Sequence, residues 1–233
     1  VWAAAVLFLL NFAWSLRAVP ASVPPEPAPP IVLNPFSGLL GWRDVPRMQP
    51  LLLASFLSMV PFAALQATLS VLAKQCLQWT PRDVSALFLV IGLTGVFTQG
   101  FILRRWLRDW PERRLVWTGS LLMLTSFVLV VVATEGLISP LLYLAMACFS
   151  LGQGLQGPAI TALVSGCGGP ETQGRLQGAN QSVQALGRVI GPLAAGYDYY
   201  HFGPTSSYRY GWVLFLAAAL CTDLALRREL KKS

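Results

Sequence analysis

Long apolar runs separated by short basic loops constrain this chain more than any other feature. Seven of them occur in the 233 residues, at about 1–16, 50–73, 84–103, 115–133, 138–164, 174–200 and 210–226. A helix needs about 20 residues to cross the hydrocarbon core of a bilayer. The last six runs meet this length, the final one with the help of its aromatic flank. The sequence therefore predicts an all-α, polytopic membrane protein with a six-helix transmembrane bundle.

Composition supports a membrane environment. Apolar residues make up 55% of the chain and charged residues only 12%, whereas a soluble domain carries about 25% charged residues. The net charge of +7 would suit nucleic acid, but the positive residues lie in short loops between apolar runs. This placement is a topology signal, so we expect membrane lipid as a partner and no nucleic acid.

The chain divides into four predicted segments. The first run, 1–16, begins without an initiator Met or a basic region before it, which favours the end of a truncated transmembrane helix over a signal peptide. Residues 17–48 contain eight prolines and form a predicted semi-rigid linker. Residues 49–228 form the predicted bundle, and 229–233 a tail.

The loop charges predict an orientation. Thirteen Lys and Arg residues fall in the 17–49, 104–114 and 165–175 loops and the tail, and three in the alternate loops. The positive-inside rule therefore places the 17–48 loop and the C-terminus in the cytoplasm, in a multi-pass protein of the cell (inner) membrane. The opposite interface carries a predicted aromatic belt, made of Tyr197, Tyr199, Tyr200, Phe202, Tyr208, Tyr210 and Trp212.

The segment 173–197 carries a polar stripe along an apolar helix. Steps of three and four residues place six side chains on one face: Gln177, Asn180, Gln184, Gly187, Arg188 and Gly191. The other face is Leu176, Ala179, Val183, Leu186, Ile190 and Leu193. Among spanning helices, a polar face is expected to look into a water-filled cavity. A transport pathway is therefore the leading hypothesis.

Arg188 is the most costly residue of this stripe. It lies about 22 Å along the span from Gln173, where a charge costs at least about 2.5–3.5 kcal/mol. One interpretation is attraction of an anionic substrate or participation in proton coupling. The other is a structural pairing with a neighbouring helix, and the sequence favours the two equally.

Further uncharged polar residues interrupt the other spans, notably Gln66, Gln99, Gln153 and Gln156. Such groups suit an amphipathic organic substrate that makes a few hydrogen bonds in a mostly apolar pocket. The alternative for any one of them is a hydrogen bond between helices, worth about 0.6 kcal/mol on average. Helix bending and close packing are predicted at Pro61, Gly157, Pro158, Gly187, Gly191 and Pro192.

The sequence shows no group of residues that is typical of an enzyme active site. The four cysteines show no paired spacing, and the single His201 sits in the aromatic belt. Asp223 stands four residues before Arg227, where an i,i+4 ion pair would account for it. We therefore expect no catalytic residues, no metal site and no cofactor.

Four segments together resemble the C-terminal half of a major facilitator superfamily transporter, closest to the tetracycline/multidrug–proton antiporter group. They are LNPF at 33–36, PERR at 111–114, GPAITALVS at 157–165 and QGRLQGANQSVQALGRVIGP at 173–192. The resemblance implies that the complete spans are the seventh to twelfth helices of a twelve-helix fold, and that 1–16 ends the sixth. It also implies a missing N-terminal six-helix half.

The same resemblance implies a cytoplasmic gating loop, here Arg104, Arg105, Asp109, Arg113 and Arg114. The chain departs from the group at four positions. Gly95 stands where tetracycline exporters have a histidine, and Met123 where they have an aspartate. Arg104 and Pro111 replace the two glycines of the loop.

The sequence as a whole predicts a transporter that moves small organic compounds by alternating access, with proton-coupled drug or metabolite efflux preferred. One alternative is a uniporter or importer of a metabolite on the same fold. The other is a polytopic membrane enzyme or a non-transporting membrane protein, which would need a His/Asp/Glu cluster at one interface.

Overall fold

A computed structural model of the chain describes residues 2–18, 45, 47–106 and 108–230. The chain divides into two units, Val1–Leu33 and Asn34–Ser233. In the first unit the described residues form one helix, α1 (Trp2–Ala18), over the predicted end of a span. Most of the predicted linker at 17–48, with its segment 33–36, lies outside the described residues, as do the last three residues of the predicted tail.

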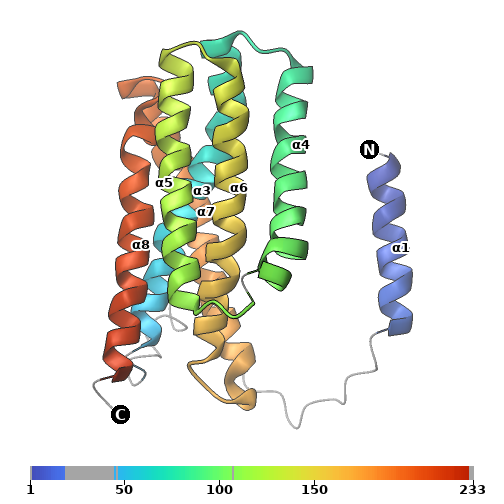
Figure 1. Ribbon diagram of the computed structural model, residues 1–233, viewed down its shortest axis with the longest axis vertical. Helices are drawn as coiled ribbons and strands as arrows, with labels where there is room; N and C mark the ends of the chain where they lie inside the picture. The colour runs from blue at the N-terminus through green and yellow to red at the C-terminus, as the bar shows by residue number, and fades with distance from the viewer. Residues whose placement is uncertain (1, 19–44, 46, 107, 231–233) are drawn as a thin grey trace. The chain divides into compact units, whose positions relative to one another are not determined.

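The described residues of the second unit form six long helices, which alternate in direction (Figure 1). They are α3 (Met48–Leu77), α4 (Pro81–Phe97), α5 (Glu112–Glu135), α6 (Ser139–Ser165), α7 (Gln173–Phe202) and α8 (Ser206–Leu230). A π-helix, η1 (Thr98–Trp106), continues α4, and a short 3-10 helix, η2 (Pro170–Thr172), precedes α7. No strand occurs in the described part of the chain, so the predicted all-α class is confirmed.

Four segments of the described residues are long and apolar enough to cross a membrane: Met48–Leu77, Pro81–Arg105, Glu112–Glu135 and Ser206–Arg227. The other two predicted spans, α6 and α7, have 27 and 30 residues and are therefore also long enough. They fall short of that apolar composition because glutamines and glycines take the place of apolar residues on them. Polarity is thus concentrated on two helices of the six.

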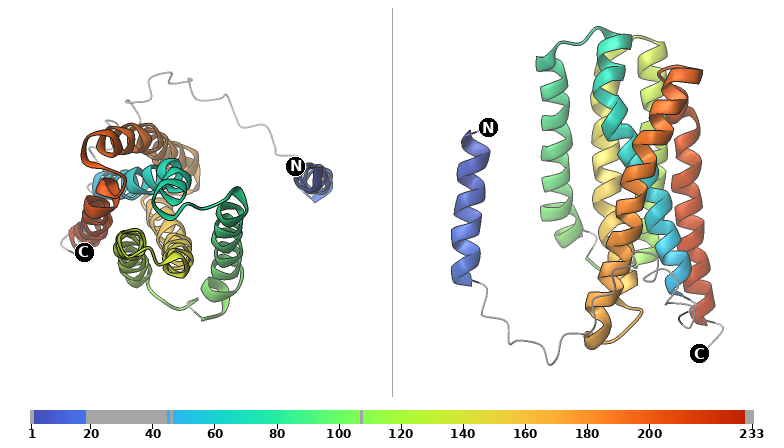
Figure 2. Two further views of the ribbon diagram at one scale, coloured as in Figure 1. Left: turned by 90° about the horizontal axis from the view of Figure 1, so that it is seen from above. Right: turned by 180° about the vertical axis from the view of Figure 1, so that it is seen from behind.

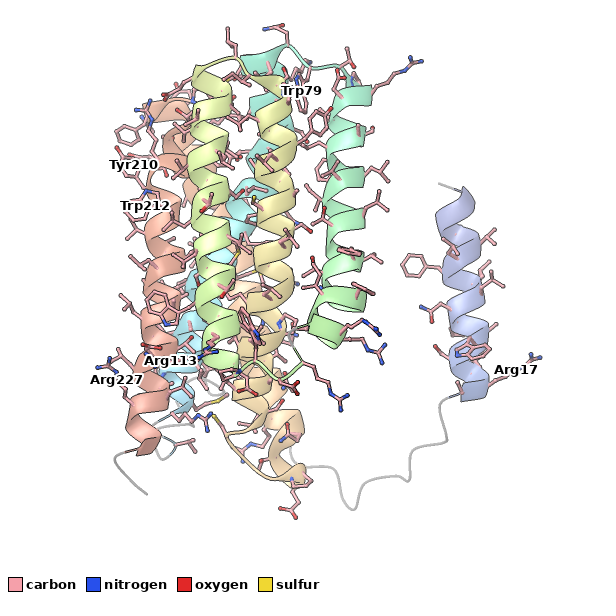
Figure 3. All side chains as sticks on the ribbon, viewed as in Figure 1. Arg17, Trp79, Arg113, Tyr210, Trp212 and Arg227 are labelled. Atoms are coloured by element: carbon pink, nitrogen blue, oxygen red, sulfur yellow. The ribbon has the colours of Figure 1, made fainter. Side chains whose placement is uncertain are left out.

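The two ends of the bundle differ in composition as the sequence predicts. Arg113 and Arg227 lie at one end, and Trp79, Tyr210 and Trp212 lie toward the other (Figure 3). One belt residue is placed differently. Tyr208 is 1% exposed and its hydroxyl shares a hydrogen bond of 2.8 Å with Thr68. It is a core residue rather than an interface residue, because α8 turns that side chain toward α3.

Helix α3 is the centre of the bundle and packs against α5, α6, α7 and α8. Glycines allow the closest approaches. A Cβ added at Gly152 of α6 would lie 2.6 Å from the Gly119 carbonyl oxygen of α5. A Cβ at Gly187 of α7 would lie 2.9 Å from Met59 Cβ. Small residues at these crossings bring the helix backbones together, as is usual between membrane helices.

Prolines sit inside three of the long helices without ending them: Pro61 in α3, Pro158 in α6 and Pro192 in α7. Helix α7 runs obliquely across α3 (Figure 2). As a result the face that α7 buries changes along its length. Leu176 and Val183 are buried, as predicted for the apolar face, whereas Leu193 is 69% exposed and Gly191 is buried in its stead.

Candidate functional site

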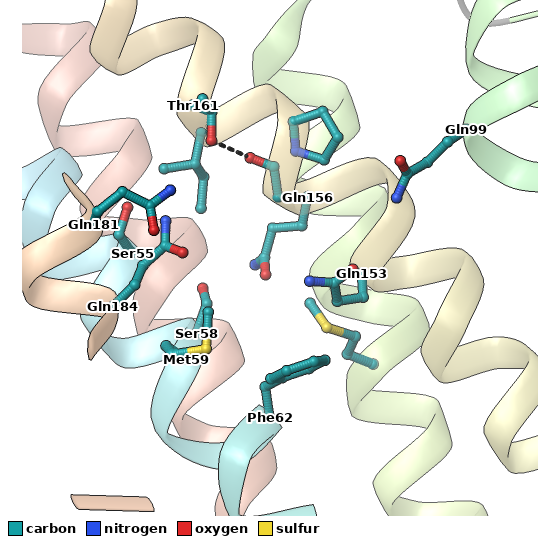
Figure 4. A pocket seen from close by; sticks show the side chains of 14 residues that line it. Ser55, Ser58, Met59, Phe62, Gln99, Gln153, Gln156, Thr161, Gln181 and Gln184 are labelled. Carbon is teal, nitrogen blue, oxygen red and sulfur yellow. Dashed lines mark hydrogen bonds between the residues drawn. The ribbon is translucent and has the colours of Figure 1, made fainter. Parts of the chain in front are cut away.

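A cavity of 230 Å³ lies within the bundle, between α3, α6 and α7, with η1 and α5 contributing at its side. Its lining is polar without being charged (Figure 4). The polar side chains are Ser55, Ser58, Gln99, Gln153, Gln156, Thr161, Gln181 and Gln184. Apolar contact is provided by Met59, Phe62, Met123 and Ile160, and the remaining lining by Gly157 and Pro158.

Four amides of this cavity have no hydrogen bond within the described part of the chain. They belong to Gln99, Gln153, Gln181 and Gln184, and come from η1, α6 and α7. Each amide offers two donors and one acceptor. In a membrane-embedded cavity such groups need water or a ligand as partner. These side chains are therefore the ones that can bind a polar guest.

Three other predicted pathway residues are already bonded to neighbouring helices. Gln156 Nε2 donates to Ser120 Oγ at 2.6 Å, and Gln177 Nε2 donates to Ser165 Oγ at 2.6 Å. Asn180 is fully buried, and its Oδ1 accepts from Ser55 Oγ at 2.6 Å. Gln156 still borders the cavity, but Gln177 and Asn180 do not. For these two, the hydrogen-bonding alternative describes the geometry.

The rest of the predicted stripe on α7 does not face the cavity either. Gly187 and Gly191 pack against α3, which agrees with the packing role predicted for them. Arg188 is exposed and has no ion pair or hydrogen bond among the described residues. The predicted polar face is therefore covered unevenly, because the oblique crossing of α3 buries Gly187 and Gly191, whereas a pathway role for Arg188 stays a prediction.

An apolar chamber of 370 Å³ adjoins this polar cavity, between α3, α4 and α6. The two spaces share Phe62, Gln99 and Gln153. Phe88 and Phe149 line the apolar chamber, together with the predicted pathway residue Gln66. Phe62 stacks on Phe149 with ring centroids 5.7 Å apart. The polar cavity and the apolar chamber thus meet at Phe62, Gln99 and Gln153.

All five residues of the predicted gating loop are exposed, and one of them, Arg113, is held by an ion pair. Arg104, Arg105, Asp109 and Arg114 are exposed. Arg113 binds Asp223 of α8 at two points, Nε to Oδ1 and Nη2 to Oδ2, each at 2.7 Å.

Trp117 Nε1 donates to the same Asp223 Oδ1 at 3.0 Å. The carboxylate is therefore held by two residues of α5, and Asp223 is only 8% exposed. The predicted pairing of Asp223 with Arg227 inside α8 is corrected by this contact between helices, to which Arg227 adds only a longer-range attraction.

Sequence reasoning missed four polar residues of the cavity: Ser55, Ser58, Thr161 and Gln181. Gln181 could have been found, because it lies three residues before Gln184 on the same helix face. The serines and the threonine gave no signal, since such hydroxyls also bond to their own helix, as Ser58 does to the Ala54 carbonyl and Thr161 to the Gly157 carbonyl. No cluster of three potential metal ligands occurs among the described residues.

The anchored arginine gives a direct test of stability. We expect Arg113→Ala to leave the Asp223 carboxylate with Trp117 alone, and therefore to destabilise the bundle. The effect should be smaller than for a fully buried pair because the Arg113 side chain is 56% exposed. Thermal unfolding of the purified protein in detergent should shift to a lower temperature.

Arg114→Ala is the matched control, because this neighbouring arginine is exposed and pairs with no acid among the described residues. Equal unfolding temperatures for the Arg113→Ala and Arg114→Ala proteins would show that the Asp223 contact contributes nothing to stability.

The chain is similar in sequence to a known family and to known proteins. The family model of the Major Facilitator Superfamily matches residues 1–192. The chain is 30% identical over 193 residues to Major facilitator superfamily domain-containing protein 10 of Mus musculus, covering 80% of this chain and 41% of that protein. It is 29% identical over 193 residues to Tetracycline resistance protein, class G, of Vibrio anguillarum, covering 82% and 47%.

The fold has a counterpart among solved structures. The crystal structure of the human organic anion transporter MFSD10 (TETRAN) matches with a TM-score of 0.69 and 30% sequence identity. The match covers 75% of this chain and 40% of that one. The chain thus spans less than half the length of each of these three relatives.

Proposed function

This chain belongs to the Major Facilitator Superfamily of membrane transporters, and we propose that it forms the C-terminal half of a protein that moves small organic compounds by alternating access. In this fold two bundles rock about a central site. The chain's own bundle supplies one wall of that site, and an N-terminal six-helix half of the same protein supplies the other. The helix α1 is then the end of the sixth span.

The observation that carries this proposal is the set of four unpaired amides around an uncharged cavity. A glutamine buried only for packing would have its amide satisfied by a neighbour, as Gln156 does. Free amides on three different elements converge on one space and can rearrange around a guest. Beside them, the apolar chamber next to Phe62 accepts an apolar group. The combination favours an amphipathic substrate.

Charge narrows the substrate class. Arg188 lies one helical turn beyond Gln184 on α7, and it is exposed on the surface of this bundle. In the assembled transporter it would attract a negatively charged group toward the amides. One solved relative is described as an organic anion transporter. We therefore favour an organic anion with an apolar body as the substrate.

The membrane arrangement follows the loop charges. We propose that the end of the bundle with Arg113 and Arg227 is cytoplasmic, together with the C-terminus and the loop before α3, in the cell (inner) membrane. The exposed residues Arg104, Arg105 and Arg114 would then face the N-terminal half at the cytoplasmic gate. Asp109 lies beside them.

Proton-coupled efflux is our preferred direction and energy source, but the cavity contributes nothing titratable to it. Among the described residues, no Asp, Glu, His, Lys or Arg side chain lines the polar cavity. The coupling proton would therefore be carried by the N-terminal half. The same observation favours a uniporter or importer as the second candidate function, because facilitated movement needs no proton-binding group.

An imposed pH gradient separates these two functions. In proteoliposomes that contain the full-length transporter, proton-coupled efflux predicts that substrate accumulation follows the gradient and collapses when a protonophore is added. Flux that equilibrates the substrate and ignores the gradient would establish the uniporter and remove the antiporter. Liposomes without protein control for passive entry of the substrate.

The free amides can be tested one at a time. We expect Gln153→Leu and Gln184→Leu each to raise the KM for transport about fivefold, because each removes about one hydrogen bond of roughly 1 kcal/mol. Uptake kinetics in proteoliposomes would measure this. Gln49→Leu, at the start of α3 and outside the cavity, is the matched control. A KM unchanged in both cavity variants would remove the proposed site.

Arg188 tests the anionic substrate. We expect Arg188→Gln to lower kcat/KM for an organic anion about tenfold, since a charged hydrogen-bond partner is lost, while Arg188→Lys retains much of the activity. The amount of folded protein in the membrane should be unchanged, because Arg188 has no partner among the residues that the structure describes. Normal anion transport by a well-inserted Arg188→Gln protein would show that the residue has no role in the pathway.

A further inference from the structure

A groove on the outside of the bundle takes no part in the cavity described above. It has a volume of 380 Å³ and lies between α7 and α8, with α3 as its floor. Small residues create it: Ala64, Gly191, Ala194, Ala195 and Gly211. Its remaining walls are mostly apolar, and include Val60 and Leu214. The surface around it is apolar and open, with Leu193 69% exposed and Val213 47% exposed.

The groove has a polar end. Asp198, Ser207 and Tyr210 line it where α7 approaches its end and α8 begins. Gly191, at the apolar part, is about 10 Å further into the bilayer along α7. Polarity therefore changes along the helix axes, from a carboxylate and two hydroxyls near the membrane interface to apolar walls in the interior. A bilayer lipid has the same polarity along the same direction.

Asp198 has no partner within the described part of the chain, although it is half-buried. The nearby cation Arg209 is bound to Glu135 instead. The His201 ring packs against the Tyr197 ring at a tilt of 45°, with the ring centroids 4.3 Å apart. Lys74 lines a separate pocket at the end of α3. A carboxylate this near the hydrocarbon is costly without a counter-charge, so the groove is electrostatically incomplete.

We propose that this groove binds a phospholipid with a primary-ammonium headgroup, such as phosphatidylethanolamine. The ammonium group donates hydrogen bonds to the Asp198 carboxylate, and the start of one acyl chain lies along Ala194 and Leu214. A primary ammonium has three N–H donors, as a lysine side chain has. A quaternary choline headgroup carries the same charge without a donor, and a glycerol headgroup leaves the lipid anionic.

Headgroup chemistry provides the first test. The purified full-length transporter is titrated in detergent with phosphatidylethanolamine, phosphatidylcholine and phosphatidylglycerol of identical acyl chains, and lipid adducts are counted by native mass spectrometry. We expect phosphatidylethanolamine to bind about tenfold more tightly than phosphatidylglycerol, the difference made by one charge-assisted hydrogen bond. Asp198→Asn should abolish this preference. An Asp198→Asn protein with the wild-type preference overturns the proposal.

Steric filling provides the second test and does not depend on the charge. Ala194→Phe should fill the groove and lower binding of the tight phosphatidylethanolamine adduct at least fivefold. Leu220→Phe, at an exposed position of α8, is the control and should leave it unchanged. Retention of the adduct by the Ala194→Phe protein would place the lipid elsewhere and overturn the proposal.

Two other occupants would also contradict it. If a quaternary ammonium amphiphile without a phosphate binds this groove and phosphatidylethanolamine does not, the groove is a site for cationic compounds. If the Ala194→Cys variant of the full-length transporter, stripped of lipid in detergent, is still inaccessible to a thiol reagent, another part of the protein covers the groove. As a control, the thermal unfolding temperature of each variant is measured to check that the variant keeps its fold.

Discussion

A polar side chain on a membrane-spanning helix is costly without a partner, because the hydrocarbon offers none. That constraint organises this bundle. Helix α7 carries more polar side chains into the membrane than its neighbours, and the structure divides most of them between bonds to other helices and one shared cavity, with Arg188 left exposed. Asn180 meets Ser55 and Gln177 meets Ser165, whereas Gln181 and Gln184 are left for the cavity. The division separates residues that hold the bundle together from residues available to a substrate.

The contacts that hold the helices together lie outside the cavity. The crossing at Gly119 and Gly152 brings α5 and α6 into backbone contact. Arg113 and Trp117 fasten Asp223 and thereby join α5 to α8. Helix α4, in contrast, has Leu87 as its one buried residue among those described, and it continues into the π-helix that carries Gln99. An element with so few buried contacts is the part of such a bundle that rearranges most easily.

The polar cavity with its apolar chamber and the outer groove share one arrangement, although we propose different ligands for them. In each case a polar group without a protein partner stands next to an apolar space: the amides beside the chamber at Phe62, and Asp198 beside the groove under α7 and α8. Uncharged amides suit a transported substrate, which has to be released after it has bound. A carboxylate near the membrane interface suits the ammonium headgroup of a lipid.

The sequence by itself determined the membrane environment, the helix boundaries to within a few residues, and the polarity of α7, because length and periodicity are local properties. It pointed to Gln99, Gln153 and Gln184, and could have found Gln181 by the same spacing. Only the tertiary structure decided that Gly191 is buried while Leu193 is exposed, that Tyr208 is in the core, and that Asp223 is held by Arg113. The physical reason is that periodicity states which residues share a face of one helix, while the crossing of the neighbouring helices decides what covers each part of that face.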